Sequence, residues 1–80
     1  MEKRVAVMAI IVYDRENAQK VNAILHEYAD HVIGRMGLPH REKGMNIISV
    51  VFDAHSDTIN AASGKIGRLE GVGVKTLFSV

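Results

Sequence analysis

Apolar residues along this chain form two kinds of pattern. Residues 5–13 and 46–53 are strongly apolar runs rich in β-branched side chains, which is typical of strands buried on both faces. Elsewhere apolar residues recur with 3-4-3 spacing, at Ala18, Val21, Leu25 and Tyr28 and again at Ile59, Ala62, Ile66 and Leu69. Because this spacing places side chains on one face of a helix, the pattern predicts two central strands, each followed by an amphipathic helix.

Two weaker segments complete the expected strands. Residues 31–37 hold strand-forming side chains diluted by Gly34, Arg35 and Gly37, which favours an edge strand over a central one. Pro39 has no N–H to donate, so we expect it to end this strand, and the polar residues 40–44 form a hairpin tip. A last strand is expected over residues 74–80.

The resulting order is βαββαβ within a single domain of residues 1–80. Because crossover connections are right-handed, this order favours an α+β ferredoxin-like sandwich. We expect an antiparallel sheet with strand order 4-1-3-2 and both helices on one face. Asp14 suits the N-cap of the first helix, and Ser56 or Asp57 that of the second.

Both faces of the predicted sheet are apolar, although two helices cover only one of them. Over residues 5–12, Val5, Val7, Ala9 and Ile11 point one way and Ala6, Met8, Ile10 and Val12 the other. We expect the uncovered face to carry Ile48, Val50 and Phe52, with Met8 and Ile10 beside them. Exposed apolar patches mark association sites, so these five residues are the predicted interface of a homo-oligomer, a dimer or tetramer formed through sheet faces.

The composition of the chain argues against several classes of function. A chain of 80 residues buries only about 60–65% of its unfolded surface, and it has no cysteine for a disulfide, a thiolate nucleophile or a thiolate metal site. Oligomerisation is then the remaining source of stability. Ten Lys and Arg residues against nine Asp and Glu argue against a binder of polyanions. No segment approaches the roughly 20 apolar residues of a membrane span, so we expect a cytoplasmic protein without membrane contact.

Four histidines, His26, His31, His40 and His55, are the first candidates for a metal site. None are spaced four residues apart on a helix, and no carboxylate completes a known ligand pattern. We therefore expect solvated or capping histidines, with no metal or cofactor in a single chain. A site assembled from histidines of several subunits stays open.

Two clusters of charged residues are candidates for a binding or catalytic site. Arg35, His40, Arg41 and Lys43 form a basic cluster around the hairpin, which suits either an anionic ligand or an edge strand protected by charge. Asp14 and Asp53 follow the two central strands, so we expect them at the same end of the sheet. There they would form a carboxylate pair for acid–base catalysis or would each cap a helix. We favour the structural interpretation of both clusters.

Enzymatic and RNA-binding signatures are absent from the sequence. Its serines, Ser49, Ser56, Ser63 and Ser79, lie outside any Gly-x-Ser-x-Gly turn, and the segment Asp14-Arg15-Glu16-Asn17 has no glycine to cradle a phosphate. Its few aromatic residues do not form the run on which RRM domains stack bases. We therefore expect neither an enzyme nor direct binding of nucleic acid.

The segment Ile33-Gly-Arg-Met-Gly-Leu-Pro-His-Arg-Glu-Lys-Gly44, followed by Ile47-Ile-Ser-Val-Val51, resembles the family of regulators of the iron-only hydrogenase system. The closing segments Gly64-Lys-Ile-Gly-Arg-Leu69, Gly71-Val72 and Val74-Lys-Thr76 match the same family. The resemblance extends over nearly the whole chain and implies a stand-alone ACT-like domain found with hydrogenase maturation genes.

More broadly, the chain is similar to the ACT domain and to the C-terminal domain of the nickel-responsive repressor. Both imply small-ligand sensing by oligomers with shared sheets, and the nickel domain uses the face of Ile48, Val50 and Phe52 between subunits. Its nickel ligands correspond to about Val50, Phe52 and Thr58, which bind nickel poorly. The ACT glycine that opens the first helix is also missing from Tyr13-Asp-Arg-Glu-Asn17, so neither ligand site carries over.

These observations predict an oligomeric regulatory or small-ligand-sensing domain of the iron-only hydrogenase system. It would act through a partner, or through a small molecule bound at the subunit interface, without a DNA-binding part of its own. The alternatives left open are a small ferredoxin-fold enzyme and a purely structural assembly module.

Overall fold

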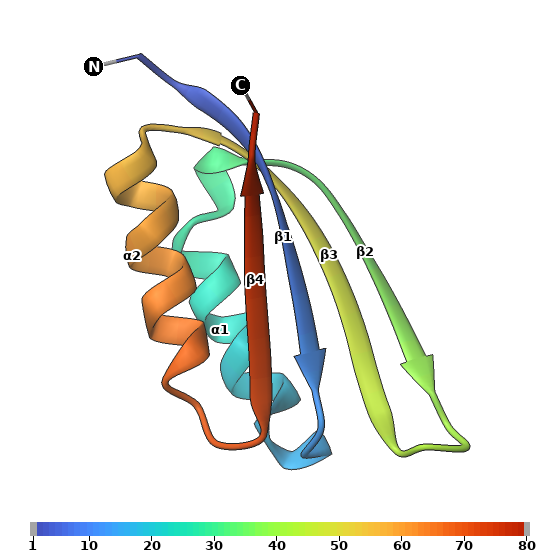
Figure 1. The fold of residues 1–80 in the computed structure, drawn as a ribbon. Helices are drawn as coiled ribbons and strands as arrows, with labels where there is room; N and C mark the ends of the chain where they lie inside the picture. The colour runs from blue at the N-terminus through green and yellow to red at the C-terminus, as the bar shows by residue number, and fades with distance from the viewer. Residues whose placement is uncertain (1, 80) are drawn as a thin grey trace.

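The computed structural model describes residues 2–79 as a four-stranded antiparallel sheet with two α-helices against one face (Figure 1). The strands are β1 (Arg4–Val12), β2 (Val32–His40), β3 (Met45–Ala54) and β4 (Val72–Phe78), and the helices are α1 (Ala18–Glu27) and α2 (Ser56–Gly67). Two short 3-10 turns, η1 (Arg15–Asn17) and η2 (Ala29–His31), precede and follow α1. The sheet order is β2-β3-β1-β4, which is the expected order read from the other edge and is compatible with a ferredoxin-like fold.

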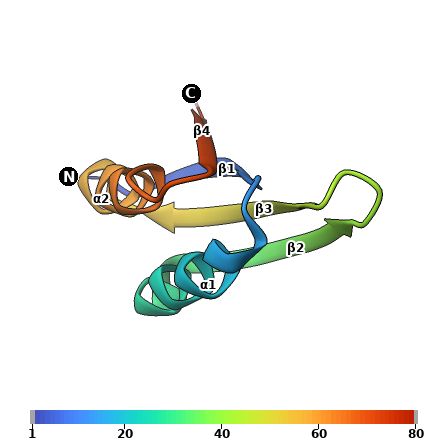
Figure 2. The same ribbon diagram turned by 90° about the horizontal axis from the view of Figure 1, so that it is seen from below.

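The register of the sheet separates its two faces. On β1, Met8 is paired with Val50 of β3 and with Thr76 of β4, whereas its neighbour Val7 is paired with Val51 and Leu77. Because successive side chains of a strand point to opposite faces, even-numbered residues of β1 share one face and odd-numbered residues the other. The sheet is strongly twisted. Helix α1 lies beside β2, and α2 lies nearer to β4 (Figure 2).

The hydrophobic core lies between the sheet and the two helices. Its fully buried side chains include Phe52, Met8 and Ile10 from the strands and Val21 and Ile59 from the helices. The helix residues are those that the 3-4-3 spacing identified, so this part of the sequence interpretation is confirmed.

The predicted choice of uncovered face is wrong. Met8, Ile10, Val50 and Phe52 are 0% exposed and Ile48 is 6% exposed within a single chain, because all five point toward the helices. Alternation along a strand defines two sets of side chains but does not say which set the helices cover. The volume and polarity of the side chains distinguish the two sets. The covered set holds Phe52 and Met8, which fill the space between the sheet and the helices, whereas the opposite set includes Ser49, Asp53 and Lys75.

The edge strand β2 is longer than expected, since it runs through Pro39 to His40. Pro39 is paired with Asn46 on an edge strand, where an imino nitrogen without a proton is tolerated because alternate backbone groups face solvent. The turn that follows lies at residues 41–44 and closes with Gly44 at φ +66°. The end of the predicted last strand, Val80, lies outside the described residues, and the observed β4 begins two residues earlier than expected.

Asp14 caps the 3-10 turn η1, whereas the N-cap of α1 itself is Asn17 and the predicted cap of α2 is not observed. The carboxylate of Asp14 accepts the backbone N–H of Glu16 at 3.0 Å, which caps the turn leading into α1. The N-cap of α2 is His55, not Ser56 or Asp57, and its side chain makes no capping hydrogen bond. Ser56 and Asp57 are instead the first residues of the helix, where the negative charge of Asp57 interacts favourably with the positive end of the helix dipole.

Candidate functional site

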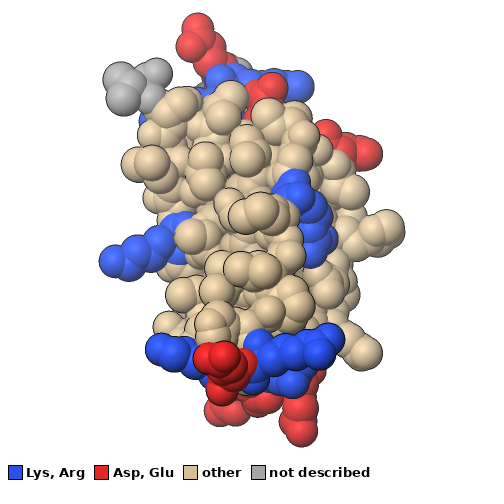
Figure 3. Space-filling model, turned by 90° about the vertical axis from the view of Figure 1, so that its right-hand side faces the viewer, with Lys and Arg blue, Asp and Glu red and all other residues tan. Residues whose placement is uncertain are grey.

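The face of the sheet opposite the helices is apolar and uncovered. We call it the open face; its side chains come from Met36 and Leu38 of β2, Ile47, Ser49, Val51 and Asp53 of β3, Val5, Val7, Ala9 and Ile11 of β1, and Lys75 and Leu77 of β4. Leu77 is 74% exposed and Met36 is 65% exposed, whereas both helices bury an apolar stripe against the other face, namely Val21 and Leu25 of α1 and Ile59, Ala62 and Ile66 of α2. Figure 3 looks onto this side and shows a mainly uncharged surface, with charged side chains at its two ends and blue ones at mid-height on either flank.

A shallow depression interrupts the open face near β4. It has a volume of about 360 Å³ and is lined by Ala9, Ile11, Tyr13, Gly73 and Lys75, with Val74 behind them. The ring of Tyr13 lies over Gly73, whose α-carbon leaves room for it: a Cβ at Gly73 would lie 3.5 Å from the Tyr13 ring. This part of the open face therefore combines an aromatic wall with an apolar floor.

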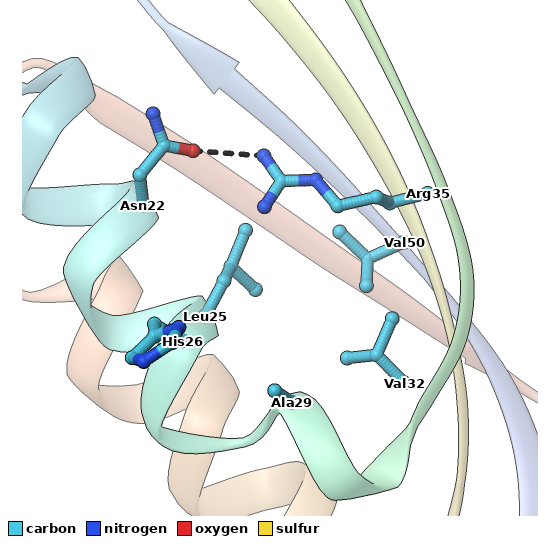
Figure 4. Close-up of a pocket in the computed structure, with 7 residues that line it drawn as sticks. All are labelled: Asn22, Leu25, His26, Ala29, Val32, Arg35 and Val50. Carbon is cyan, nitrogen blue, oxygen red and sulfur yellow. Dashed lines mark hydrogen bonds between the residues drawn. The ribbon is translucent and has the colours of Figure 1, made fainter.

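A second concave region, the α1–β2 groove, lies on the helix side of the sheet between α1 and the edge strand β2. One hollow of about 220 Å³ is lined by Asn22, Leu25, His26, Ala29, Val32, Arg35 and Val50. A neighbouring hollow of about 280 Å³ shares Asn22 and Arg35 with the first and continues along Gly37, Pro39 and Ile48. The guanidinium of Arg35 donates to Oδ1 of Asn22 at 2.8 Å and so separates the two hollows (Figure 4).

The histidines are distributed over the molecule. His26 lines the α1–β2 groove, His31 ends η2, His40 ends β2 and His55 precedes α2. No group of three or more His, Asp or Glu side chains within residues 2–79 is placed to hold a metal ion. The positions that the resemblance aligns with nickel ligands do not form a metal site either, because Val50 and Phe52 are apolar and buried in the core.

The predicted basic cluster is divided by the structure. Arg35 points to the helix side and reaches α1, whereas Arg41 and Lys43 lie in the exposed turn after β2. The backbone N–H of Lys43 donates to Nδ1 of His40 at 3.4 Å, so this imidazole supports the turn. Arg35 therefore belongs to a concave site and the hairpin residues to the solvated end of the molecule.

The expected proximity of Asp14 and Asp53 is wrong. Asp14 follows the end of β1, where Val12 is paired with Asn46, but Asp53 is paired with Val5 near the beginning of β1. Because β1 and β3 are antiparallel, the residues that follow them lie at opposite ends of the sheet. Asp53 is also part of β3 and caps no helix. The structure therefore offers no carboxylate pair there for acid–base catalysis.

Neither described helix is long and apolar enough to cross a lipid bilayer. Within residues 2–79 the longer one, α2, has 12 residues, well short of the roughly 20 that a span requires.

Comparison with known proteins identifies one family and two informative structures. Residues 4–76 match the model of the TM1266-like family, described as "Iron-only hydrogenase system regulator, putative". The structure of the uncharacterized protein TM1266 from Thermotoga maritima is 44% identical, with a TM-score of 0.93, over 99% of this chain and 100% of that one. No curated protein matches the sequence.

A more distant likeness concerns the fold alone. A formyltetrahydrofolate deformylase from Pseudomonas putida KT2440 has a TM-score of 0.65 at 13% identity, over 91% of this chain and 28% of that one. The same βαββαβ arrangement thus occurs as a part of a much longer enzyme chain.

Proposed function

The chain belongs to the TM1266-like family of iron-only hydrogenase system regulators, and from this premise we propose that it acts in the cytoplasm as a homodimer that responds to a small ligand. In this proposal two copies bury their open faces against each other, and the dimer acts on a partner protein of the hydrogenase system.

The observation that carries the dimer is the size of the open face. Four strands of about nine residues, at a rise of ~3.3 Å and a spacing of ~4.8 Å, span roughly 550 Å² in projection. The face includes Ser49, Asp53 and Lys75, so its apolar part is smaller but still within the range of the largest apolar patch on a typical monomer, about 300–600 Å². Corrugation by side chains such as Leu77 and Met36 raises the accessible area above the projection, toward the ~800 Å² that each partner of a standard interface buries.

The polar content of the face favours a second copy as its occupant. Lys75 of β4 and Asp53 of β3 carry opposite charges, so the face has no net charge to repel itself. A two-fold contact brings identical surfaces together and therefore requires this balance. A regulator description for the family favours a binding role over catalysis.

The dimer is tested by sedimentation equilibrium of the wild-type protein and two variants. Val7→Glu places a charge at the centre of the open face, and Ala61→Glu places the same charge at an exposed position of α2. We expect the wild type and Ala61→Glu to be dimers at micromolar concentration and Val7→Glu to be a monomer with an unchanged circular dichroism spectrum. A monomeric wild type, or a Val7→Glu protein that remains dimeric, would refute the open face as the interface.

The regulatory role is tested in the host cell. Iron-only hydrogenase activity is measured in a strain without this protein and after complementation with wild type, Val7→Glu or Ala61→Glu. We expect activity to change on deletion and to be restored by wild type and Ala61→Glu but not by Val7→Glu. Identical hydrogenase activity in all strains would contradict a regulatory role, whatever the oligomeric state.

A further inference from the structure

The α1–β2 groove exists because two helices do not cover four strands. The residues of β2 are exposed from Ile33 to Pro39, whereas β3 beside it buries every second residue against the helices. Helix α1 runs next to β2 without closing onto it, and the gap is spanned by one long side chain, Arg35 (Figures 2 and 4). A cavity on the surface of a small domain is thereby left open to solvent.

The first hollow has apolar side chains at its base and polar side chains around them. Leu25 of α1, Val32 of β2 and Val50 of β3 point into it, and Ala29 closes its lower end in Figure 4. Val50 is 0% exposed and Leu25 is 3% exposed, so these two side chains belong to the hydrophobic core beneath the hollow. The volume of about 220 Å³ lies below the roughly 300–1,000 Å³ of drug-sized sites, and the hollow thus suits a small metabolite.

The rim of the hollow is polar and carries a permanent positive charge. Arg35 is charged at all physiological pH values and offers five N–H donors in a planar fork. Within residues 2–79 its side chain makes one hydrogen bond, to the neutral amide of Asn22, and forms no salt bridge. No Asp or Glu lines the hollow, and His26 is the other ionisable side chain there. The geometry leaves most donors of the guanidinium available beside an apolar cavity.

We infer that the α1–β2 groove binds a small organic carboxylate with a short apolar body. The carboxylate pairs with the guanidinium fork of Arg35, which matches its two oxygens. The hydrocarbon part packs on Ala29 and Val32, above the buried side chains of Leu25 and Val50. Asn22 holds the guanidinium in place over the hollow. This inference rests on the proposed sensing role for its purpose, because the bound carboxylate would be the signal that the regulator reads.

Butyrate is a suitable probe, and its uncharged analogue butyramide is the matched control. Binding is followed by ¹H–¹⁵N correlation spectra of the wild type and of the monomeric variant Val7→Glu. We expect butyrate to shift the signals of Leu25, Val32, Arg35 and Val50, with an affinity at least tenfold above that of butyramide. From acetate to butyrate the affinity should rise about fourfold per methylene, as burial of apolar surface requires.

Three variants locate the charge that binds. Arg35→Gln removes the fork and should weaken butyrate binding at least tenfold, and Arg35→Lys keeps the charge but not the fork and should weaken it as well. Arg41→Gln removes the same charge from the exposed hairpin turn and should leave the affinity unchanged. Arg35 is exposed, so its variants should fold, and circular dichroism verifies this.

Several results would overturn the inference. These are the absence of saturable shifts with butyrate, equal binding of butyramide, equal binding of inorganic phosphate, or shifts centred on Arg41 and Lys43. Because Val7→Glu retains the groove, its titration separates the two proposals. A butyrate-binding protein that never dimerises refutes the dimer alone, and a dimer that ignores butyrate refutes the groove ligand alone.

Discussion

The carbonyl oxygen of Gly71 accepts the backbone N–H of Tyr13 at 2.7 Å, which joins the turn before β4 to the end of β1. The N–H of Asp14 lies 3.3 Å from the same oxygen. Gly71 has a φ of +68°, and a Cβ added to it would lie 2.7 Å from the Cβ of Asp14. This close approach joins the two connections at one end of the sheet and leaves no room for a side chain.

We expect Gly71→Ala to lower the free energy of unfolding by about 2–4 kcal/mol. The left-handed backbone alone costs a non-glycine residue about 1–2 kcal/mol, and the contact with Asp14 adds backbone or side-chain displacement. Urea unfolding of the two proteins measures the difference.

Gly44→Ala is the matched control for that substitution. Gly44 has a similar φ of +66°, but a Cβ there would meet nothing within 4 Å. Its cost should therefore be the backbone term of about 1–2 kcal/mol. Equal losses for the two variants would show that the contact with Asp14 has no energetic effect.

The assignment of the two sheet faces is tested by a pair of truncations. Phe52 is 0% exposed under the helices, and Leu77 is 74% exposed on the open face. At protein concentrations where the chain is monomeric, Phe52→Ala should lower the free energy of unfolding by about 3–5 kcal/mol. Leu77→Ala should change it by less than about 0.5 kcal/mol. A reversed order of the two losses would invalidate the face assignment.

Asn17 is a buried polar residue with a defined structural task. It is 8% exposed, and its side-chain amide donates to the carbonyl oxygen of Glu70, which lies in the turn before β4. Asn17→Ala leaves that carbonyl without its donor and should lower the free energy of unfolding by about 1–3 kcal/mol. Asn60→Ala, at an exposed position of α2, should be neutral or slightly stabilising because alanine favours a helix. Urea unfolding that ranks Asn60→Ala as the more damaging change would contradict this role.

Lys65 connects the two helices on the outer surface. Its Nζ lies 3.1 Å from Oε2 of Glu27 and 5.3 Å from the centre of the Tyr28 ring. The hydrogen bond to Glu27, with a further contribution from Tyr28, raises the pKa of Lys65 above its ordinary value of 10.5. The stabilisation that follows is complete below pH 10.5 and is lost as the pH rises through the folded-state pKa, because the folded protein holds this proton more tightly.

We expect Glu27→Gln to lower the pKa of Lys65 toward its ordinary value. A ¹³Cε titration of lysine by NMR measures it directly. Glu16→Gln removes a carboxylate from the turn before α1 and should leave that titration unchanged. An identical Lys65 titration in the wild type and in Glu27→Gln would contradict the role of the carboxylate.

Periodicity in the sequence predicts the order of the elements. Runs such as residues 46–53 and the 3-4-3 spacing of Ile59, Ala62 and Ile66 reflect burial directly. The sheet order needs the right-handed crossover rule in addition. Periodicity does not show which set of alternating side chains the helices cover, because the alternation is the same for both faces of the sheet. The size of Phe52 and Met8 against Ser49 and Lys75 was the available signal.

The α1–β2 groove was less accessible to sequence reasoning. It depends on the contact of Arg35 with Asn22, and these residues are 13 positions apart on a strand and a helix. The available signal was an arginine flanked by Gly34 and Gly37 in an edge strand, where a long side chain can lie across small neighbours. From the sequence alone, that pattern favours protection of the edge strand by charge.

The sheet is a single layer, so Val50 forms the floor of the groove and Val51, the next residue of β3, lies on the open face. One peptide unit thus separates a cavity from an association surface. A ligand that changes the twist of β3 at Val50 also changes the shape that Val51 presents to a second copy. Thermodynamic linkage makes such an effect reciprocal: if occupancy of the cavity tightens the dimer tenfold, the dimer binds the occupant tenfold more tightly. Such coupling between the groove and the open face requires no hinge or moving loop, because the two surfaces are separated only by the thickness of one strand.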